Sequence, residues 1–226
     1  VFACWGLEQD EFSLGTAGFV DVIKGTIYAD LLMRVVNRIK PYEQQLGTAS
    51  QLCDSWLQRC REDILHGGYR NFAQNIHQII ADFDAVPLDD RLWKPRVGVV
   101  GEILVKYHPI ANNHIEQVLA DEGAEVVMPD LVEFFLYMAY DDIVKYRLLD
   151  GRLVDKLKSE LFIQVLEFFR RPMRRALQKS RHFTVPHSIK EIAAMAEKHI
   201  SLGNMAGEGW FLTGEMLQLI KGGTPN

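Results

Sequence analysis

Apolar residues recur at helical spacing through the first third of the chain. The pattern is carried by Phe19, Ile23, Ile27, Leu31, Val35 and Ile39. It predicts a deeply buried helix over residues 19–39, which Lys40-Pro41 ends because proline cannot continue a helix. A second helix, capped by Thr48 or Ser50 and ending at Gly67-Gly68, and a third over residues 69–83 are expected to follow. Residues 1–93 therefore read as a mostly helical segment that packs on a sheet formed further along.

The pattern changes at Lys94. Residues 96–100 form a short run rich in valine, with glycine at positions 98 and 101. Such a run is typical of a buried parallel strand. A helix over residues 112–121 is expected next, with Gly123 where a C-terminal cap belongs, and then a second strand over residues 125–128. A strand, a helix and a strand within about 35 residues have the size of a right-handed crossover unit.

Helical periodicity returns from residue 131 to about residue 181, with a break at Asp150-Gly151. Ser188 and Glu191 have the spacing of a capping box, and a final amphipathic helix ends near Lys221. A stable sheet needs more than two strands, so we expect residues 1–5 to supply another. The predicted fold is a helix-rich, three-layer α/β domain with a small parallel sheet, in which residues 94–226 form one segment with a helical insertion over residues 131–199.

Composition narrows the class of protein. The chain has 226 residues, of which 48% are hydrophobic and 24% are charged, which is typical of a folded domain with a core. The net charge of −5 gives no general attraction to nucleic acid or to an anionic membrane. No apolar stretch approaches the ~20 residues that span a bilayer. The chain begins without methionine and ends in a loop, so we expect a piece of a larger multidomain chain that is inactive when isolated.

The three cysteines are too few and too dispersed for a disulfide framework. Cys4, Cys53 and Cys60 indicate a reducing compartment, and hence a cytoplasmic protein. Cys53 and Cys60 stand seven residues apart, near one face of a helix, where small core residues are the simpler interpretation. Their spacing does not suit a closed cluster or a structural zinc site, so no metal is expected in this chain.

Two loops that contain glycine are the candidates for chemistry. The first includes Gly98, Gly101 and Glu102 at the end of the predicted strand, where ligands bind in open α/β sheets. Its neighbours Asn112, Asn113 and His114 stand at the start of the next helix. The spacing matches neither a dinucleotide fingerprint nor a phosphate loop, so tight turns and helix capping are the favoured interpretation. Glu102 is the single strongest candidate, and a structural role for it is favoured over a catalytic one.

The second loop, residues 203–209, precedes the last helix. Gly203, Asn204, Gly207 and Glu208 could form an anion-binding nest at the positive end of a helix, although the carboxylate of Glu208 opposes this. A flexible connection is an equally good interpretation. Because both loops adjoin helix starts, we expect them to meet at the carboxyl end of the strand.

The basic run from Arg170 to Arg181 could hold phosphates, but a solvated helix face is the commoner meaning of such a run.

These segments together resemble a known family. Residues 101–109, Gly-Glu-Ile-Leu-Val-Lys-Tyr-His-Pro, with Ala111-Asn112-Asn113, resemble the (R)-2-hydroxyacyl-CoA dehydratase family. They look most like the C-terminal region of the large fused CoA-substrate-specific enzyme activases of anaerobic bacteria. Residues 38–43, with Lys40-Pro41-Tyr42-Glu43, and residues 203–215 look like that region as well. The resemblance covers most of the chain and implies Rossmann-like or flavodoxin-like α/β architecture.

The resemblance also implies a function. In that family an ATPase with a [4Fe–4S] cluster drives an electron into a dehydratase, which carries its own [4Fe–4S] cluster and removes water from an acyl-CoA. This chain resembles the dehydratase-like part, but it lacks the short cysteine motifs, so the cluster and ATP are expected in the parent protein only. The expected partners are other domains of the same chain, a dehydratase or activase subunit, and acyl-CoA.

Three functional hypotheses follow. The first is a domain of this radical-enzyme system, with Glu102 as the catalytic candidate. Its expected ligand-binding residues are Gly101, Asn112, Asn113, His114, Gly203, Asn204, Gly207 and Glu208. The second is a non-catalytic module that docks the activase to its partner. The third is a free-standing domain that binds a nucleotide or a sugar phosphate. Only the similarity of the expected fold to such domains supports it.

Overall fold

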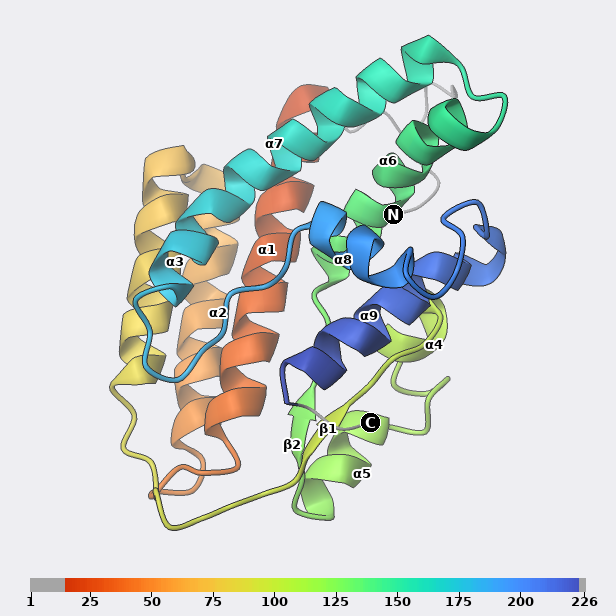
Figure 1. The fold of residues 1–226 in the computed structure, drawn as a ribbon. Helices are drawn as coiled ribbons and strands as arrows, with labels where there is room; N and C mark the ends of the chain where they lie inside the picture. The colour runs from red at the N-terminus through yellow and green to blue at the C-terminus, as the bar shows by residue number, and fades with distance from the viewer. Residues whose placement is uncertain (1–14, 224–226) are drawn as a thin grey trace.

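A bundle of long helices forms the body of the molecule. The computed structural model describes residues 15–223, and it is shown in Figure 1. The bundle consists of α1 (Gly15–Ile39), α2 (Thr48–His66), α3 (Tyr69–Asp84), α6 (Leu131–Leu148) and α7 (Leu153–Leu177). Helices α1, α2 and α3 pack against one another, and α7 crosses α1 and α3 at the upper side of Figure 1.

A small parallel sheet lies beside this bundle. It consists of β1 (Arg96–Gly98) and β2 (Glu125–Val127), with Val97 opposite Val126 in the register. The chain passes from β1 to β2 through α4 (Ile103–Tyr107) and α5 (Ile115–Asp121), and this is the expected strand–helix–strand unit. The strand β2 packs on α1, so the sheet is attached to the bundle through that helix.

The C-terminal part closes over the sheet and the bundle. Residues 178–188 run in front of α2 and α1 in Figure 1 and lead into α8 (Ile189–Ala196). A short 3-10 turn (Ala206–Glu208) then precedes α9 (Gly209–Lys221), which packs on α8. The last turn of α9 reaches the sheet, because Arg96 Nη1 donates to the Gly222 carbonyl at 3.1 Å.

The predicted α/β architecture is wrong. The structure is 67% helical, and in its described part the only sheet has two strands of three residues each. It is therefore a mostly helical fold and not a three-layer Rossmann-like or flavodoxin-like domain. Most local elements were recognised, except α4, which was expected as a loop. Helices α6 and α7, expected as an insertion, belong to the main body. The further strand expected at residues 1–5 lies outside the described residues.

One hydrophobic core joins the two segments that the sequence suggested. Trp56, Phe72 and Phe83 of the first segment belong to the same buried cluster as Trp210 and Phe211 of the second. The Trp210 indole donates to Asp141 Oδ1 at 2.8 Å, so its polar edge is satisfied inside the core. Burial of five such aromatic side chains, at roughly 2 kcal/mol each, fixes α9 and the N-terminal helices in one body.

Helix α7 contains a proline without ending there. Pro172 has no N–H to bond the carbonyl of Phe168, four residues earlier. The hydroxyl of Tyr69, at the start of α3, lies 3.5 Å from that carbonyl oxygen and donates to it. The rings of Tyr69 and Phe168 are stacked with their centroids 4.6 Å apart. The contact between α3 and α7 therefore satisfies the group that the proline leaves free.

The predicted N-terminal caps of α8 and α2 have different outcomes. The capping box of Ser188 and Glu191 at α8 is confirmed. The prediction that Thr48 or Ser50 caps α2 is wrong, because the buried carboxylate of Glu43 accepts from Gly47 N at 2.6 Å and from Ala49 N at 2.7 Å. A carboxylate that precedes the helix thus takes the role of its cap.

No helix in residues 15–223 is both long enough and apolar enough to cross a membrane.

We expect Glu43→Gln to lower the free energy of unfolding by about 1–2 kcal/mol, because one of two buried N–H donors at the start of α2 loses its acceptor. Ser50→Ala is the matched control, and we expect it to change stability by less than about 0.5 kcal/mol. Urea unfolding followed by circular dichroism measures both. Equal losses for the two variants would contradict the assignment of Glu43 as the cap.

Candidate functional site

The two glycine-containing loops meet at the end of β1, as the sequence predicted. Glu102 caps α4, and its carboxylate accepts from Leu104 N at 3.0 Å and from Val105 N at 3.2 Å. Glu208 comes from the other loop, and its carboxylate lies 3.4 Å from Ile103 N. Burial raises the pKa of Glu208, and the nearby charge of Glu102 raises it further.

A buried ion pair holds this junction together. Lys106 of α4 and Glu215 of α9 lie 2.7 Å apart, and both side chains are almost completely buried. Burial raises the pKa of Glu215 to about 7, although the ammonium group of Lys106 partly offsets that effect. Breaking such a pair would leave an uncompensated charge inside the protein, so it ties the two loops to each other.

The other predicted ligand-binding residues surround the junction. Asn112 donates to the Lys106 carbonyl at 2.9 Å and accepts from Ile115 N at 3.3 Å, so it caps α5. The exposed residues of this group are Asn113, His114, Gly203, Asn204 and Gly207. Gly101 lies next to the cap of α4. Because Glu102 and Glu208 concentrate negative charge here, a phosphate would be repelled. The ligand-binding role of these residues stays a prediction.

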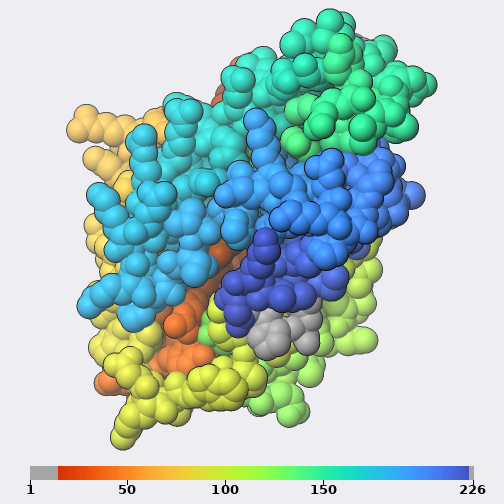
Figure 2. All heavy atoms as spheres, viewed as in Figure 1, coloured from red at the N-terminus to blue at the C-terminus, as the bar shows by residue number. Residues whose placement is uncertain are grey.

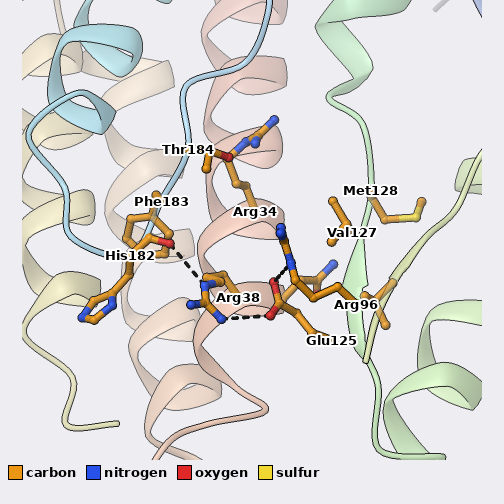
Figure 3. Close-up of a pocket in the computed structure, with 11 residues that line it drawn as sticks. Arg34, Arg38, Arg96, Glu125, Val127, Met128, His182, Phe183 and Thr184 are labelled. Carbon is orange, nitrogen blue, oxygen red and sulfur yellow. Dashed lines mark hydrogen bonds and ion pairs between the residues drawn. The ribbon is translucent and has the colours of Figure 1, made fainter. Parts of the chain in front are cut away.

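A second site has the opposite charge. A cavity of about 170 Å³ lies between α1, β2 and residues 182–184 (Figure 3). Its lining includes Arg34, Arg38, Arg96, Glu125, His182 and Thr184. We call this cavity the arginine pocket. The two arginines of α1 reach it from one side and Arg96 of β1 from the other, as Figure 3 shows.

Glu125 organises the arginine pocket. Its carboxylate is almost fully buried and lies 2.9 Å from Arg38 Nη1 and 2.9 Å from Arg96 Nε. Tyr42 donates a third hydrogen bond to it at 2.9 Å. Glu125, at the first position of β2, therefore ties that strand to α1, to the loop after α1 and to β1. Glu125 was not among the residues predicted from the sequence, because a lone glutamate at the start of a strand carries no motif.

In the described part of the chain, the guanidinium groups of Arg34, Arg38 and Arg96 have N–H donors that form no hydrogen bond. Arg38 uses Nη1 on Glu125 and Nε on the His182 carbonyl, while Arg34 uses Nε and Nη2 on Asp130. Within residues 15–223, no group accepts a hydrogen bond from Nη2 of Arg96 or Nη1 of Arg34, and the guanidinium group of Arg38, which also lies 4.9 Å from the centre of the Tyr42 ring, has five N–H groups for these few partners. Three cationic groups thus offer unused N–H donors around one cavity.

A buried cluster of charges adjoins the arginine pocket. Asp30 of α1 accepts from Leu131 N at 2.8 Å and from Val132 N at 2.9 Å, so it caps α6 from a distant part of the chain. Arg34 Nη2 lies 2.6 Å from Asp130 Oδ1. Arg170 of α7, which has no exposed surface, stands near the same aspartate at 3.9 Å. Asp30, Arg34 and Arg38 form one stripe of α1 with a spacing of four residues.

Glu133 is the unusual member of this cluster. It is buried, it lies 3.8 Å from Arg170, and its two carboxyl oxygens accept no hydrogen bond within the described residues. Burial and the neighbouring Asp130 raise the pKa of Glu133 to about 8. Burial raises the pKa of Asp30 as well, but the two backbone donors favour its ionised form. Burial thus raises the pKa of both carboxyl groups, and Glu133 is the one without a hydrogen-bond donor that would favour its ionised form.

The cysteines of the described part do not suit an iron–sulfur cluster. Cys60 is buried and Cys53 is half-buried, and both belong to α2. Burial raises the pKa of Cys60 to about 12, and these two cysteines are fewer than the four thiolate ligands of a [4Fe–4S] cluster. In residues 15–223 no group of three or more candidate ligands could hold a metal ion. Cys4 lies outside these residues.

The sequence contained a signal for the buried charges. Asp30 and Arg34 interrupt the apolar run of α1 on a face that was expected to be buried. Arg170 was assigned to a solvated basic run, and for that residue the assignment is wrong. Its neighbours Arg171 and Arg175 are exposed, as expected. A charge within an apolar stripe predicts a partner elsewhere, but the spacing alone does not say which one.

No family model, no curated protein and no solved structure matches this chain. The resemblance to the dehydratase family therefore stays a prediction, and the function has to be argued from the arginine pocket and its surroundings.

We expect Glu102→Ala to lower the free energy of unfolding by about 1 kcal/mol, because two N–H groups at the start of α4 lose their acceptor. Glu102→Gln keeps one acceptor oxygen, so its loss should be less than half as large. Glu62→Ala, at an exposed position of α2, is the control. Thermal melts that leave Glu102→Ala unchanged would contradict the capping role.

The raised pKa of Glu133 predicts a pH dependence of stability. The unfolded chain releases this proton near pH 4.5 and the folded protein near pH 8. Stability therefore falls as the pH rises through that window, by about 1.4 kcal/mol per pH unit. Glu133→Gln imitates the protonated form, so we expect it to match the wild type near about pH 5 and to exceed it near about pH 8.

Urea unfolding across that pH range measures this difference, with Glu62→Gln as the exposed control. Parallel pH profiles for the wild type and Glu133→Gln would show that Glu133 is ionised in the folded protein.

Proposed function

We propose that this chain is the acyl-CoA-binding part of a (R)-2-hydroxyacyl-CoA dehydratase and activase system, and that the arginine pocket holds an anionic group of the ligand. One observation carries the proposal: three guanidinium groups with unused donors converge on one cavity. The resemblance of residues 38–43, 101–109, 111–113 and 203–215 supplies the class of ligand.

The size of the cavity limits what it can hold. Pockets that enclose a whole small-molecule ligand have volumes of about 300–1,000 Å³. At about 170 Å³ the arginine pocket suits a single phosphate or carboxylate group. The remainder of a coenzyme would then lie outside it, over the open side of the sheet. The pocket thus anchors one end of the ligand and does not enclose it.

The charges favour an anion. Arg34, Arg38 and Arg96 contribute three positive charges, against two negative charges from Glu125 and Asp130. The carboxylates hold the guanidinium groups in place and leave a net positive charge. The planar fork of arginine donates two parallel hydrogen bonds to phosphate or carboxylate oxygens, so it binds such groups in a fixed orientation. Thr184 at the exposed side adds a hydroxyl group.

The rest of the proposed chemistry belongs to the parent protein. The [4Fe–4S] cluster would supply the electron for dehydration, and the described cysteines do not suit it. Within this chain the arginine pocket binds and orients the ligand, and the buried Lys106–Glu215 pair positions the two loops.

The test introduces a repelling charge without disturbing Glu125. Thr184 lines the arginine pocket from an exposed position. A carboxylate at that position would stand within about 6 Å of the bound anion, so we expect Thr184→Glu to weaken coenzyme A binding about tenfold. Thr184→Gln has the same size without the charge, and it should bind as the wild type does. Isothermal titration calorimetry measures the affinities.

Two comparisons make this test decisive. Pantetheine, which lacks the phosphates of coenzyme A, should bind at least tenfold more weakly to the wild type. Arg91→Gln removes an exposed charge outside the arginine pocket and should leave the affinity unchanged. Equal binding of pantetheine and coenzyme A, or no difference between Thr184→Glu and Thr184→Gln, would refute the anion site.

A further inference from the structure

The outer face of α7 carries a row of exposed apolar side chains. Val154, Leu157, Leu161 and Phe168 are 58%, 53%, 62% and 42% exposed. Together with Gln164 they are spaced alternately three and four residues apart, which is the spacing of a coiled-coil seam. We call this row the α7 seam. Surface apolar residues are normally scattered, so a row with this regular spacing calls for an explanation.

Most of the α7 seam lies apart from the face that stabilises the fold, although Phe168 also stacks on Tyr69 of α3. Leu166, Phe169 and Met173 of the same helix are buried in the core, where α7 packs on α6, α3 and α1. The helix lies along the upper edge of the molecule in Figure 1, and its C-terminal half is visible on the surface in Figure 2. A helix of 25 residues is about 37 Å long, enough for a second helix to pack along it.

A cluster of positive charges continues the α7 seam. Arg171 and Arg175 occupy the next two positions of the same spacing, and Lys179 and Arg181 follow. All four side chains are exposed, and none forms an ion pair with any residue between 15 and 223. Arg171 lies 5.8 Å from the centre of the Phe168 ring. Four neighbouring cations repel one another, so an acidic partner would be attracted to this end.

The same charges argue against a second copy of this chain. An antiparallel copy would place the basic end of one α7 against the start of the other. There Asp155 is already paired with Arg152, and Lys156 with Glu160. A parallel copy would place the two basic ends together. Neither arrangement supplies the acidic groups that four cations require.

We propose that the α7 seam binds an amphipathic helix of another protein or domain, one whose apolar row ends in a cluster of acidic residues. Its leucine-like side chains would pack between Val154 and Phe168, and its carboxylates would meet Arg171 and Arg175. This surface lies on a different helix from the residues of the arginine pocket, and the proposal does not depend on the ligand of that pocket.

The probe is a synthetic peptide of about 21 residues, long enough to cover the α7 seam as a helix. It carries leucine at the seam positions and glutamate at one end, and a matched peptide carries lysine in place of glutamate. Fluorescence anisotropy of the labelled peptides measures binding to the whole chain. We expect the glutamate peptide to bind about tenfold more tightly than the lysine peptide.

Two paired variants separate the apolar and the charged contributions. Leu157→Asp with Leu161→Asp should abolish peptide binding, whereas Leu57→Asp with Leu65→Asp, at comparably exposed positions of α2, should leave it unchanged. Arg171→Glu with Arg175→Glu should reverse the preference, so that the lysine peptide binds more tightly. Circular dichroism confirms that each variant is folded.

Three outcomes would overturn the proposal. The first is equal affinity for the two peptides, and the second is an equal loss of binding in the two pairs of leucine variants. The third is a dimer of the wild type in sedimentation that Leu157→Asp with Leu161→Asp dissociates, because the α7 seam would then be occupied by a second copy.

Discussion

One stripe of charges on α1 holds the two halves of the protein together. Asp30 accepts the first N–H groups of α6, Arg34 binds Asp130, and Arg38 binds Glu125 at the start of β2. The three residues stand four apart, so they form a row that faces the chain from β2 to α6. Each contact is directional and largely buried, and an unpaired charge in its place would be costly. The apolar core adds free energy, but these contacts determine which face of α1 meets the sheet.

The arginine pocket is a by-product of that attachment. A guanidinium group has five N–H donors, and Arg34, Arg38 and Arg96 each donate two hydrogen bonds to carboxylates or carbonyls. The three arginines line the cavity between α1, β2 and residues 182–184. A lysine in the same place would satisfy a carboxylate but would not present a planar fork to a second anion. The residues that fix the sheet on α1 are thus also those that can hold a ligand.

The segments that carry the family resemblance also have structural tasks. Residues 38–43 contribute Arg38, Tyr42 and Glu43, which bind Glu125 or cap α2. Residues 101–109 contribute Lys106, and residues 203–215 contribute its partner Glu215. The second and third segments therefore meet through a buried ion pair, whereas the first binds β2 and the start of α2. The residues that form the family pattern in such segments therefore stabilise the fold, whether or not they also bind a ligand.

The sequence predicted the elements better than their arrangement. Helical periodicity located α1, α2, α3, α7 and α9, and the strand–helix–strand unit was confirmed, because each depends on local apolar spacing. The meeting of the two loops followed from their positions next to helix starts. The fold class was wrong, because two short strands suggested a large sheet while α6 and α7 were treated as an insertion. The arginine pocket was missed because its residues come from α1, β1 and β2, and spacing along a chain does not reveal contacts across it.

The stripe on α1 has a consequence for the order of folding. Its partners lie far away along the chain: Asp30 is 101 residues from Leu131, and Arg38 is 87 residues from Glu125. Closing such a loop carries an entropic cost that local contacts do not. The hairpin of α2 and α3 needs no distant partner, so it can form early. We expect the strand β2 and the start of α6 to dock on α1 afterwards, and this docking would complete the cavity lined by arginine.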